Sequence, residues 1–264
     1  MAEITAAMVK ALRDETSQGM MECKKALQET DGDMEAAKDL LRKTGSVKAE
    51  KKAERSTSEG LVRIRVADDA KAATMVELKC ETDFCSRNDE FQAMADKVAD
   101  LAAGAGVGAV EASDEIASAV QDCFGKIGEN MSYARGIKVA GDRVGSYMHH
   151  NNKVGVLVAV DGEADDDLLT KLCQHIAFAN PMGLSADDVP ADLVEKERAF
   201  ATEEASESGK PAEIVEKMVE GKVRKFLAAN ALLEQAFIHD EKSKVKDVLG
   251  GATLTAFARF SVGS

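Results

Sequence analysis

The residues of this chain best suited to metal binding are its four histidines, two of which are adjacent. His149 and His150 precede Asp161 and a run of aspartates at 165–167, so a metal site could be drawn there. A catalytic zinc ion, however, needs three protein ligands, and neighbouring residues of a strand face opposite ways. We therefore expect a solvated loop at the histidines, and a turn followed by a helix N-terminus at the aspartates. No metal ligand is predicted.

Thiol chemistry is the second possibility that the residue types raise. Cys80 or Cys85 could supply a nucleophile and His175 a base, but nothing in their spacing supports such a pair. The chain has five cysteines, an odd number, and none of them has C-x-x-C spacing. We therefore expect buried, reduced thiols rather than a disulfide framework or a zinc site. A thiol or metal hydrolase stays as one alternative, to be tested by the position of these side chains.

Loops that bind nucleotide phosphates are absent from the sequence. It contains no G-x-x-x-x-G-K-[ST] segment and no G-x-G-x-x-G segment after a strand. The glycines at 104, 106 and 108 follow a predicted helix and are expected to form a flexible connection. The sequence therefore predicts no catalytic constellation, no covalent chemistry and no cofactor.

The segment 81–88, ETDFCSRN, places a carboxylate and a large aromatic ring side by side. It joins the end of a predicted strand to the start of a helix, so it is expected to be an exposed turn. Exposure of Phe84 would be conspicuous, because the chain has only nine Phe, two Tyr and no Trp. The alternative is that Phe84 packs into the core and Asp83 caps the helix. Composition alone favours that alternative.

The charge balance restricts the kinds of partner that the chain can bind. It has 264 residues, with 34 basic against 47 acidic side chains and a net charge of −13. Such an acidic chain argues against direct nucleic-acid binding and against an anionic membrane surface, and leaves a protein partner open. No segment approaches the roughly 20 apolar residues of a membrane span, and residues 1–4 do not begin a signal peptide. We expect a cytoplasmic protein, long enough for two or three small modules.

Helical and strand periodicities alternate along the first half of the chain. Residues 1–50 predict three short helices, the last ending near Gly45, and the charged segment 48–60 predicts a linker that is helical at its start. Apolar residues at 61–66 and 75–78 predict two strands joined by a hairpin. One helix is expected from Asp89, and a second to about Asn130.

The pattern of two strands followed by a helix occurs again about 80 residues later. It suggests either a duplicated hairpin-plus-helix unit or the chance recurrence of a common supersecondary unit. Its strands are predicted at 144–148 and 154–160, and its helix at 168–176. Residues 190–229 predict an antiparallel helical hairpin with a thin apolar seam that includes Phe200 and Ile214, interrupted at 208–211 by a helix stop and start. The alternating residues 254–262 predict a last strand.

Four blocks of the sequence together carry a specific resemblance to a known family. They are GMMECKKAL at 19–27, TDFC at 82–85, KVGVLV at 153–158, and SGKP at 208–211 followed by EKMVEG at 216–221. In this order they resemble the bacterial translation elongation factor Ts family. Cys85 stands where the family usually has Val, and Glu22 where it has Asp. The loop after His149 is one residue longer than the family pattern, and the sequence predicts no helix beyond the last strand.

The resemblance implies an α+β fold. Residues 1–55 would form a three-helix module similar to a ubiquitin-associated domain, with its linker. The core would contain two related hairpin-and-helix subdomains, at 56–140 and 141–264. The antiparallel helical hairpin would be inserted in the second of them, at about 190–229.

The resemblance also implies a guanine nucleotide exchange factor for elongation factor Tu, which displaces Mg²⁺ and promotes GDP release. By this resemblance the residues that dislocate the partner's Mg²⁺ are Thr82, Asp83, Phe84 and Cys85. Further partner contacts would come from Arg13, Met20, Met21, His149, Phe237 and Ile238. The helical hairpin would allow a homodimer or a complex of two copies of each protein. The alternative function is a protein-docking adapter without exchange activity.

Overall fold

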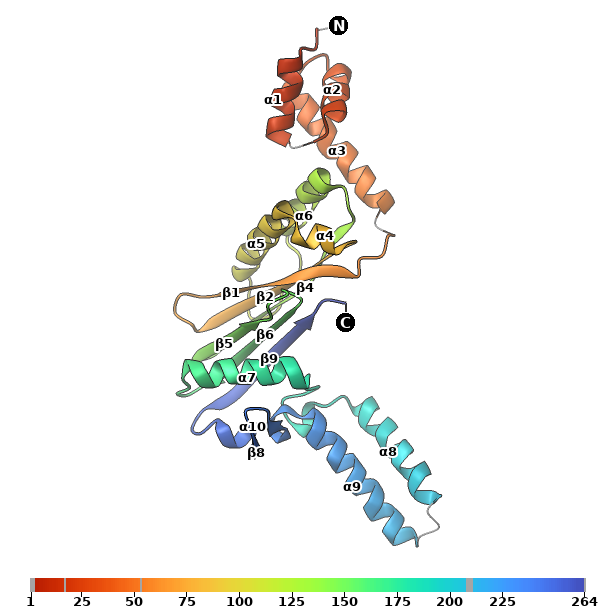
Figure 1. Ribbon diagram of the computed structural model, residues 1–264, viewed down its shortest axis with the longest axis vertical. Coiled ribbons are helices and arrows are strands. Elements are labelled where there is room, and N and C mark those ends of the chain that lie inside the picture. Colours follow the sequence, from red (N-terminus) through yellow and green to blue (C-terminus); the bar gives the residue numbers. More distant parts are fainter. Residues whose placement is uncertain (1–2, 17, 53, 208–210, 264) are drawn as a thin grey trace.

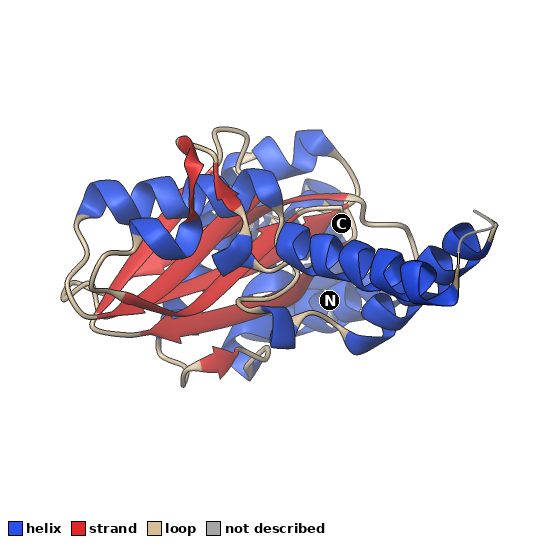
Figure 2. Ribbon diagram, turned by 90° about the horizontal axis from the view of Figure 1, so that it is seen from below, coloured by secondary structure: helices blue, strands red, loops and turns tan. Residues whose placement is uncertain are grey.

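The computed structural model describes residues 3–16, 18–52, 54–207 and 211–263. Helices and strands are mixed, so the fold is α+β (Figures 1 and 2). Figure 1 shows a small helical bundle at one end, two sheets in the middle and a helical hairpin that projects at the other end. Seen along the long axis in Figure 2, the strands lie between helices.

The N-terminal bundle contains α1 (Ala6–Thr16), α2 (Met20–Glu29) and α3 (Met34–Lys52). The prediction that the third helix ends near Gly45 is wrong. One glycine inside a helix costs only about 1 kcal/mol, and α3 packs against α6 of the core, which offsets that cost. The bundle buries a small apolar core of its own, made of Val9, Leu12, Cys23, Ala26, Leu27 and Ala37.

The first sheet has four antiparallel strands in the order β1-β2-β4-β3. Their bounds are β1 (Glu59–Val66), β2 (Ala72–Cys80), β3 (Gly108–Ala109) and β4 (Met131–Ala140). The hairpin of β1 and β2 agrees with the prediction, but the sequence pattern missed β4. Polar residues interrupt the apolar pattern of β4, so its periodicity alone does not indicate a strand.

Two helices, α5 (Asp89–Ala103) and α6 (Asp114–Ile127), cover the outer face of this sheet (Figure 1). Each begins at a side-chain cap. Asn88 Oδ1 accepts a hydrogen bond from the Glu90 amide at 2.9 Å, and Ser113 Oγ accepts one from the Ile116 amide at 3.3 Å. The helices pack on Leu78 of β2 with buried apolar side chains that include Phe91, Val98, Ile116 and Phe124.

The second sheet has three antiparallel strands in the order β5-β6-β9. They are β5 (Arg143–Met148), β6 (Val154–Asp161) and β9 (Thr253–Ser261), close to the predicted ranges. Helix α7 (Asp166–Ala179) covers the outer face of the sheet (Figure 1). The helix N-terminus predicted at the aspartates is confirmed, and Asp165 Oδ1 caps it by accepting a hydrogen bond from the Leu168 amide at 2.7 Å.

The two sheets pack face to face, and their inner faces share a third apolar layer. At Gly155 the approach is so close that a Cβ atom would lie 2.7 Å from both Met75 Sδ and Val62 Cγ1. An antiparallel hairpin with a helix on its outer face therefore occurs in each half of the core. Buried residues of the shared layer include Val62, Met75, Leu157, Ala159 and Phe260.

The projecting hairpin consists of α8 (Ala191–Ser206) and α9 (Ala212–Asn230). Its seam contains the buried residues Ala201, Ala205, Val219 and Val223, of which the two valines were predicted. Phe200 and Ile214 were expected in the seam but are 71% and 46% exposed, because Ala201, Ala205, Val219 and Val223 occupy the facing sides of the two helices. Of the predicted stop and start, residues 208–210 lie outside the described residues, and Pro211 directly precedes α9.

Short elements connect α7, the hairpin and the last strand. They are η1 (Ala186–Asp188), η2 (Leu232–Glu234), β7 (Ala236–Phe237), β8 (Asp240–Lys244) and α10 (Val245–Val248). Leu232, Phe237 and Val245 from this region join the core between α7 and the second sheet. Within the described residues, no helix has the length and apolar character that crossing a membrane requires.

Candidate functional site

A short helix, α4 (Asp83–Arg87), lies between the end of β2 and the start of α5. Thr82 begins it: the backbone of Thr82 is extended and its Oγ1 accepts a hydrogen bond from the Cys85 amide at 3.1 Å. Asn88, also extended, ends α4 and caps α5. Two caps six residues apart limit the helix to one short segment. Asp83 lies inside α4 and Asn88 caps α5, so the alternative in which Asp83 caps the following helix is wrong.

The Phe84 ring points away from the protein. Its side chain is 80% exposed, whereas the next two residues, Cys85 and Ser86, are 2% and 7% exposed. A helix of five residues can turn only one side to the core, and Cys85 and Ser86 occupy that side. The interpretation in which Phe84 packs into the core is therefore wrong. A large, exposed ring on a capped helix is suited to insertion into another protein.

Asp83 presents a carboxylate beside this ring. Its Oδ2 atom lies 3.2 Å from Arg87 Nη2, one turn along the helix, and both side chains are substantially exposed. An exposed pair of this kind contributes only about 0.3–0.5 kcal/mol to stability. The Asp83 carboxylate is therefore available to a partner at small cost.

A pocket of about 290 Å³ brings Asp83 together with the loop between β5 and β6. Asp83, Ser86 and Arg87 line it from α4, and residues 150–153 line it from the loop. The loop is tied to β1, because the Val62 amide donates to the Asn152 carbonyl at 2.8 Å and Lys153 Nζ lies 2.6 Å from Glu59 Oε2. The pocket thus joins the two halves of the core beside Phe84.

His149 begins this loop and is half-buried. Its Nδ1 atom lies 2.9 Å from the Tyr147 hydroxyl, and its ring centroid lies 4.2 Å from that of His150. Among the described residues no three side chains of His, Cys, Asp or Glu form a group that could hold a metal ion. The two histidines are therefore part of a loop surface.

Three other predicted contact residues lie in the N-terminal bundle. Arg13 of α1 is exposed, and Met20 and Met21 at the start of α2 are 46% and 75% exposed. None of the three lines the pocket beside α4. Their flexible thioethers and guanidinium are accessible for a second, separate contact with a partner.

The prediction that Phe237 contacts a partner is wrong, whereas Ile238 stays a candidate contact. The Phe237 side chain is only 4% exposed and packs in the core under α7, with its ring centroid 5.7 Å from that of His175. We therefore remove Phe237 from the candidate contact surface. Ile238 is half-buried, and its amide donates a hydrogen bond to His175 Nδ1 at 3.3 Å.

The thiols are poorly placed for nucleophilic chemistry. All five cysteines are buried and none is in a disulfide. Burial raises the pKa of Cys123 to about 12 and that of Cys173 to about 12. Contact with Cys85 and burial also raise the pKa of Cys80. Cys80, Cys123 and Cys173 therefore stay protonated at neutral pH, and the thiolate is the reactive form.

His175 is likewise not a base for a cysteine. It is 1% exposed, and its Nε2 atom lies 2.9 Å from Gln235 Oε1 while Nδ1 faces the Ile238 amide. The neutral ring with its proton on Nε2 satisfies both contacts. The pairing of His175 with Cys80 or Cys85 is therefore wrong.

Burial lowers the pKa of His175 from its ordinary value of 6.5. The unfolded chain then binds a proton at a higher pH than the folded chain does. We expect the contribution of His175 to stability to be complete above pH 6.5 and to be lost as pH falls through the folded-state pKa. Urea unfolding at pH 7.5 and 5.5 should show a smaller pH-dependent loss of unfolding free energy in His175→Gln than in the wild type. His150→Gln, a change at an exposed ring, should keep the wild-type loss, and equal losses in all three proteins would contradict the assignment.

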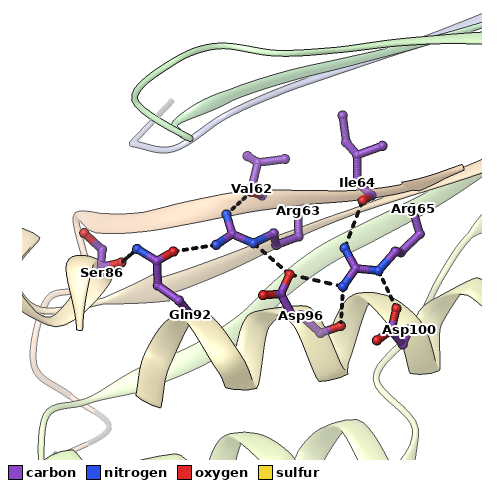
Figure 3. A network of polar contacts seen from close by, with 8 residues as sticks. All are labelled: Val62, Arg63, Ile64, Arg65, Ser86, Gln92, Asp96 and Asp100. Carbon is purple, nitrogen blue, oxygen red and sulfur yellow. Dashed lines mark hydrogen bonds and ion pairs between the residues drawn. The ribbon is translucent and has the colours of Figure 1, made fainter. Parts of the chain in front are cut away.

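The sequence analysis missed the polar network that joins β1 to α5 (Figure 3). Arg63 Nε lies 3.1 Å from Asp96 Oδ1, and Arg65 Nη2 lies 3.1 Å from the same oxygen. Arg65 also pairs with Asp100. The signal was present: two arginines at alternate positions of a strand face polar residues spaced by four along the next helix, at 92, 96 and 100.

Comparison with known proteins gives consistent matches. A family model described as elongation factor TS matches residues 81–264. Elongation factor Ts of Hydrogenovibrio crunogenus is 45% identical over 271 residues, which cover 98% of this chain and 92% of the relative. That of Pasteurella multocida is 46% identical over 268 residues, covering 100% and 93%. That of Thioalkalivibrio sulfidiphilus is 43% identical over 272 residues, covering 98% and 92%.

Proposed function

This chain belongs to the elongation factor Ts family, and on that premise we propose that it is a guanine nucleotide exchange factor. Its partner is elongation factor Tu with bound GDP, and it promotes GDP release during translation elongation in the cytoplasm. The observation that carries the proposal is the 80% exposed Phe84 ring beside the Asp83 carboxylate on the capped helix α4.

The proposed mechanism needs no covalent chemistry. Phe84 enters between helices of the partner, and burial of one Phe side chain supplies roughly 1.5–3 kcal/mol for a local rearrangement. Asp83 approaches the Mg²⁺ side of the partner's nucleotide site. Mg²⁺ requires near-octahedral ligands at about 2.0–2.1 Å, so a small displacement of its surroundings weakens its binding. Thr82 and Cys85 shape the turn that presents both side chains.

Weakening of GDP binding must be matched by an equal weakening of this protein's own binding when GDP is present. A thousandfold change corresponds to about 4 kcal/mol, more than one ring supplies. We therefore propose a broad contact that adds Arg13, Met20, Met21, His149 and Ile238. The N-terminal bundle and the second subdomain would hold the partner while α4 of the first subdomain acts on its nucleotide site.

We also propose the domain division that the resemblance implies. The module at 1–55 carries the methionine contact, the subdomain at 56–140 carries α4, and the subdomain at 141–264 carries the His149 loop and the hairpin. The exposed Phe200 and Ile214 of the hairpin offer a surface for self-association, as a homodimer or in a complex with two copies of each protein.

Release of a fluorescent GDP from elongation factor Tu, followed by stopped flow, tests the exchange function. We expect the release rate to rise with the concentration of this protein and then to saturate, because a complex forms before GDP leaves. A rate that is unchanged at a concentration where binding is complete would refute exchange. That outcome would instead support the second candidate, a docking adapter, which the exposed Met21, Phe200 and Ile214 favour.

A further inference from the structure

Side chains from elsewhere in the chain hold both ends of α4. We infer that two of them, Glu129 and Gln92, keep the Phe84 ring in a fixed orientation while it enters the partner. Glu129 lies in the connection between α6 and β4, and Gln92 lies on the first turns of α5. We call these two residues the α4 brace. The inference rests on the exchange function proposed above.

Glu129 holds the N-terminal end of α4. Its Oε2 accepts a hydrogen bond from the Thr82 amide at 3.2 Å, and the Thr82 hydroxyl lies 3.0 Å from both carboxylate oxygens. The same hydroxyl accepts the hydrogen bond from Cys85 that starts the helix. Hydrogen bonds to an ionised group are about twice as strong as neutral ones. Glu129 therefore fixes both the position of Thr82 and the orientation of its cap.

Gln92 holds the C-terminal end. Its Nε2 donates to the Ser86 carbonyl at 3.4 Å, and its Oε1 accepts from Arg63 Nη2 at 2.7 Å (Figure 3). Arg63 is itself held by Asp96, so the contact continues into the network between β1 and α5. The last turn of α4 is thus tied through one amide group to the first sheet.

A brace is needed because α4 has only five residues, too few to be stable as a helix by itself. Phe84 adds no restraint, since its ring is exposed. If α4 could move freely, insertion of the ring would displace α4 instead of the partner's helices. Ordering α4 before contact also removes an entropy cost from binding. Glu129 and Gln92 are positioning residues: they act through α4, and the proposal gives them no contact with the nucleotide site.

Hydrogen–deuterium exchange of the free protein tests the brace directly. In Glu129→Ala and in Gln92→Leu we expect the Cys85 amide to exchange about tenfold faster or more, because each variant loses contacts that hold α4. Asp100→Asn is the matched control, since it breaks an ion pair in the same network without touching α4. It should leave the Cys85 amide unchanged. Wild-type exchange at Cys85 in both brace variants would overturn the proposal.

The exchange assay tests the consequence for function. Both brace variants should lower the saturating rate of GDP release about tenfold, with less than about a twofold change in the half-saturating concentration. Glu129→Gln, which retains an acceptor oxygen for Thr82, should recover most of the rate. In a Phe84→Ala background the brace variants should have a clearly smaller effect, because only Asp83 then remains for α4 to present to the partner. A full additional loss in the double variants would overturn the proposal.

The two measurements separate the two claims. If the wild-type chain does not accelerate GDP release, the proposed function fails, and amide exchange at Cys85 still decides whether the brace holds α4. If the wild-type chain is active and α4 becomes mobile in the variants without loss of rate, the brace has no role in exchange and the inference is overturned.

Discussion

Phe84→Ala is expected to lower the saturating rate of GDP release by about 10- to 100-fold. The estimate follows from the roughly 1.5–3 kcal/mol that burial of one Phe side chain supplies, since every 1.4 kcal/mol is a factor of about ten. The variant should still bind elongation factor Tu, because the other proposed contacts lie in separate parts of the chain. Stopped-flow release of fluorescent GDP over a range of concentrations separates the saturating rate from the affinity.

The same substitution should leave the protein's own stability unchanged. The Phe84 ring is 80% exposed, and substitutions at exposed positions are usually within about 0.5 kcal/mol of the wild type. An equal thermal midpoint would therefore show that the loss of rate does not come from unfolding.

Phe178→Ala provides a matched control. Phe178 lies near the end of α7 and is also 80% exposed, so it has the same chemistry and accessibility on another face of the core. We expect a wild-type rate. Equal losses in both variants would point to a nonspecific effect of exposed rings. Weaker binding of Phe84→Ala with an unchanged saturating rate would make Phe84 an anchor and not a wedge.

Local periodicity was sufficient to predict much of the core. The hairpin of β1 and β2 and the hairpin of β5 and β6 follow from runs of apolar residues separated by turn residues. β4 could not be predicted in this way, because its polar residues find partners only in the folded sheet. Arg135 Nε lies 2.6 Å from Oε2 of the buried Glu77, and the guanidinium lies 4.3 Å from the Phe260 ring centroid. The Arg135 charge is therefore paired with Glu77 of β2, and the guanidinium lies over the ring of Phe260 of β9.

The candidate site was only partly predictable for the same reason. The adjacency of Asp83 and Phe84 is visible in the sequence, but the exposure of the ring is set by which side of α4 packs inward. That choice depends on contacts over long separations, such as the one between Thr82 and Glu129, 47 residues apart. Burial of Phe237 under α7 is another tertiary outcome that a family resemblance did not reveal.

Among substitutions that add one methyl group near the site, Gly60→Ala is expected to cause the largest loss of unfolding free energy. Gly60 lies in β1, is buried, and lines the pocket beside α4. Its φ is +148°, and a Cβ atom there would lie 2.0 Å from the Leu78 carbonyl oxygen of β2. Since that oxygen belongs to the backbone of the neighbouring strand, the clash can be relieved only by separating β1 from β2. We expect a loss of about 4 kcal/mol or more in unfolding free energy.

Gly108→Ala separates the two causes of this loss. Gly108 also has a positive φ, +111°, but a Cβ atom there would meet nothing within 4 Å. Gly108→Ala should therefore lose only the unfolding free energy that corresponds to backbone strain, about 1–3 kcal/mol. Urea unfolding of the two variants gives the cost of the clash as the difference between them. Equal losses would mean that β1 can shift away from β2 at Gly60 at little cost in free energy. Since β1 carries Arg63, which holds Gln92 of the brace, such a mobile strand could not keep α4 in place when a partner binds.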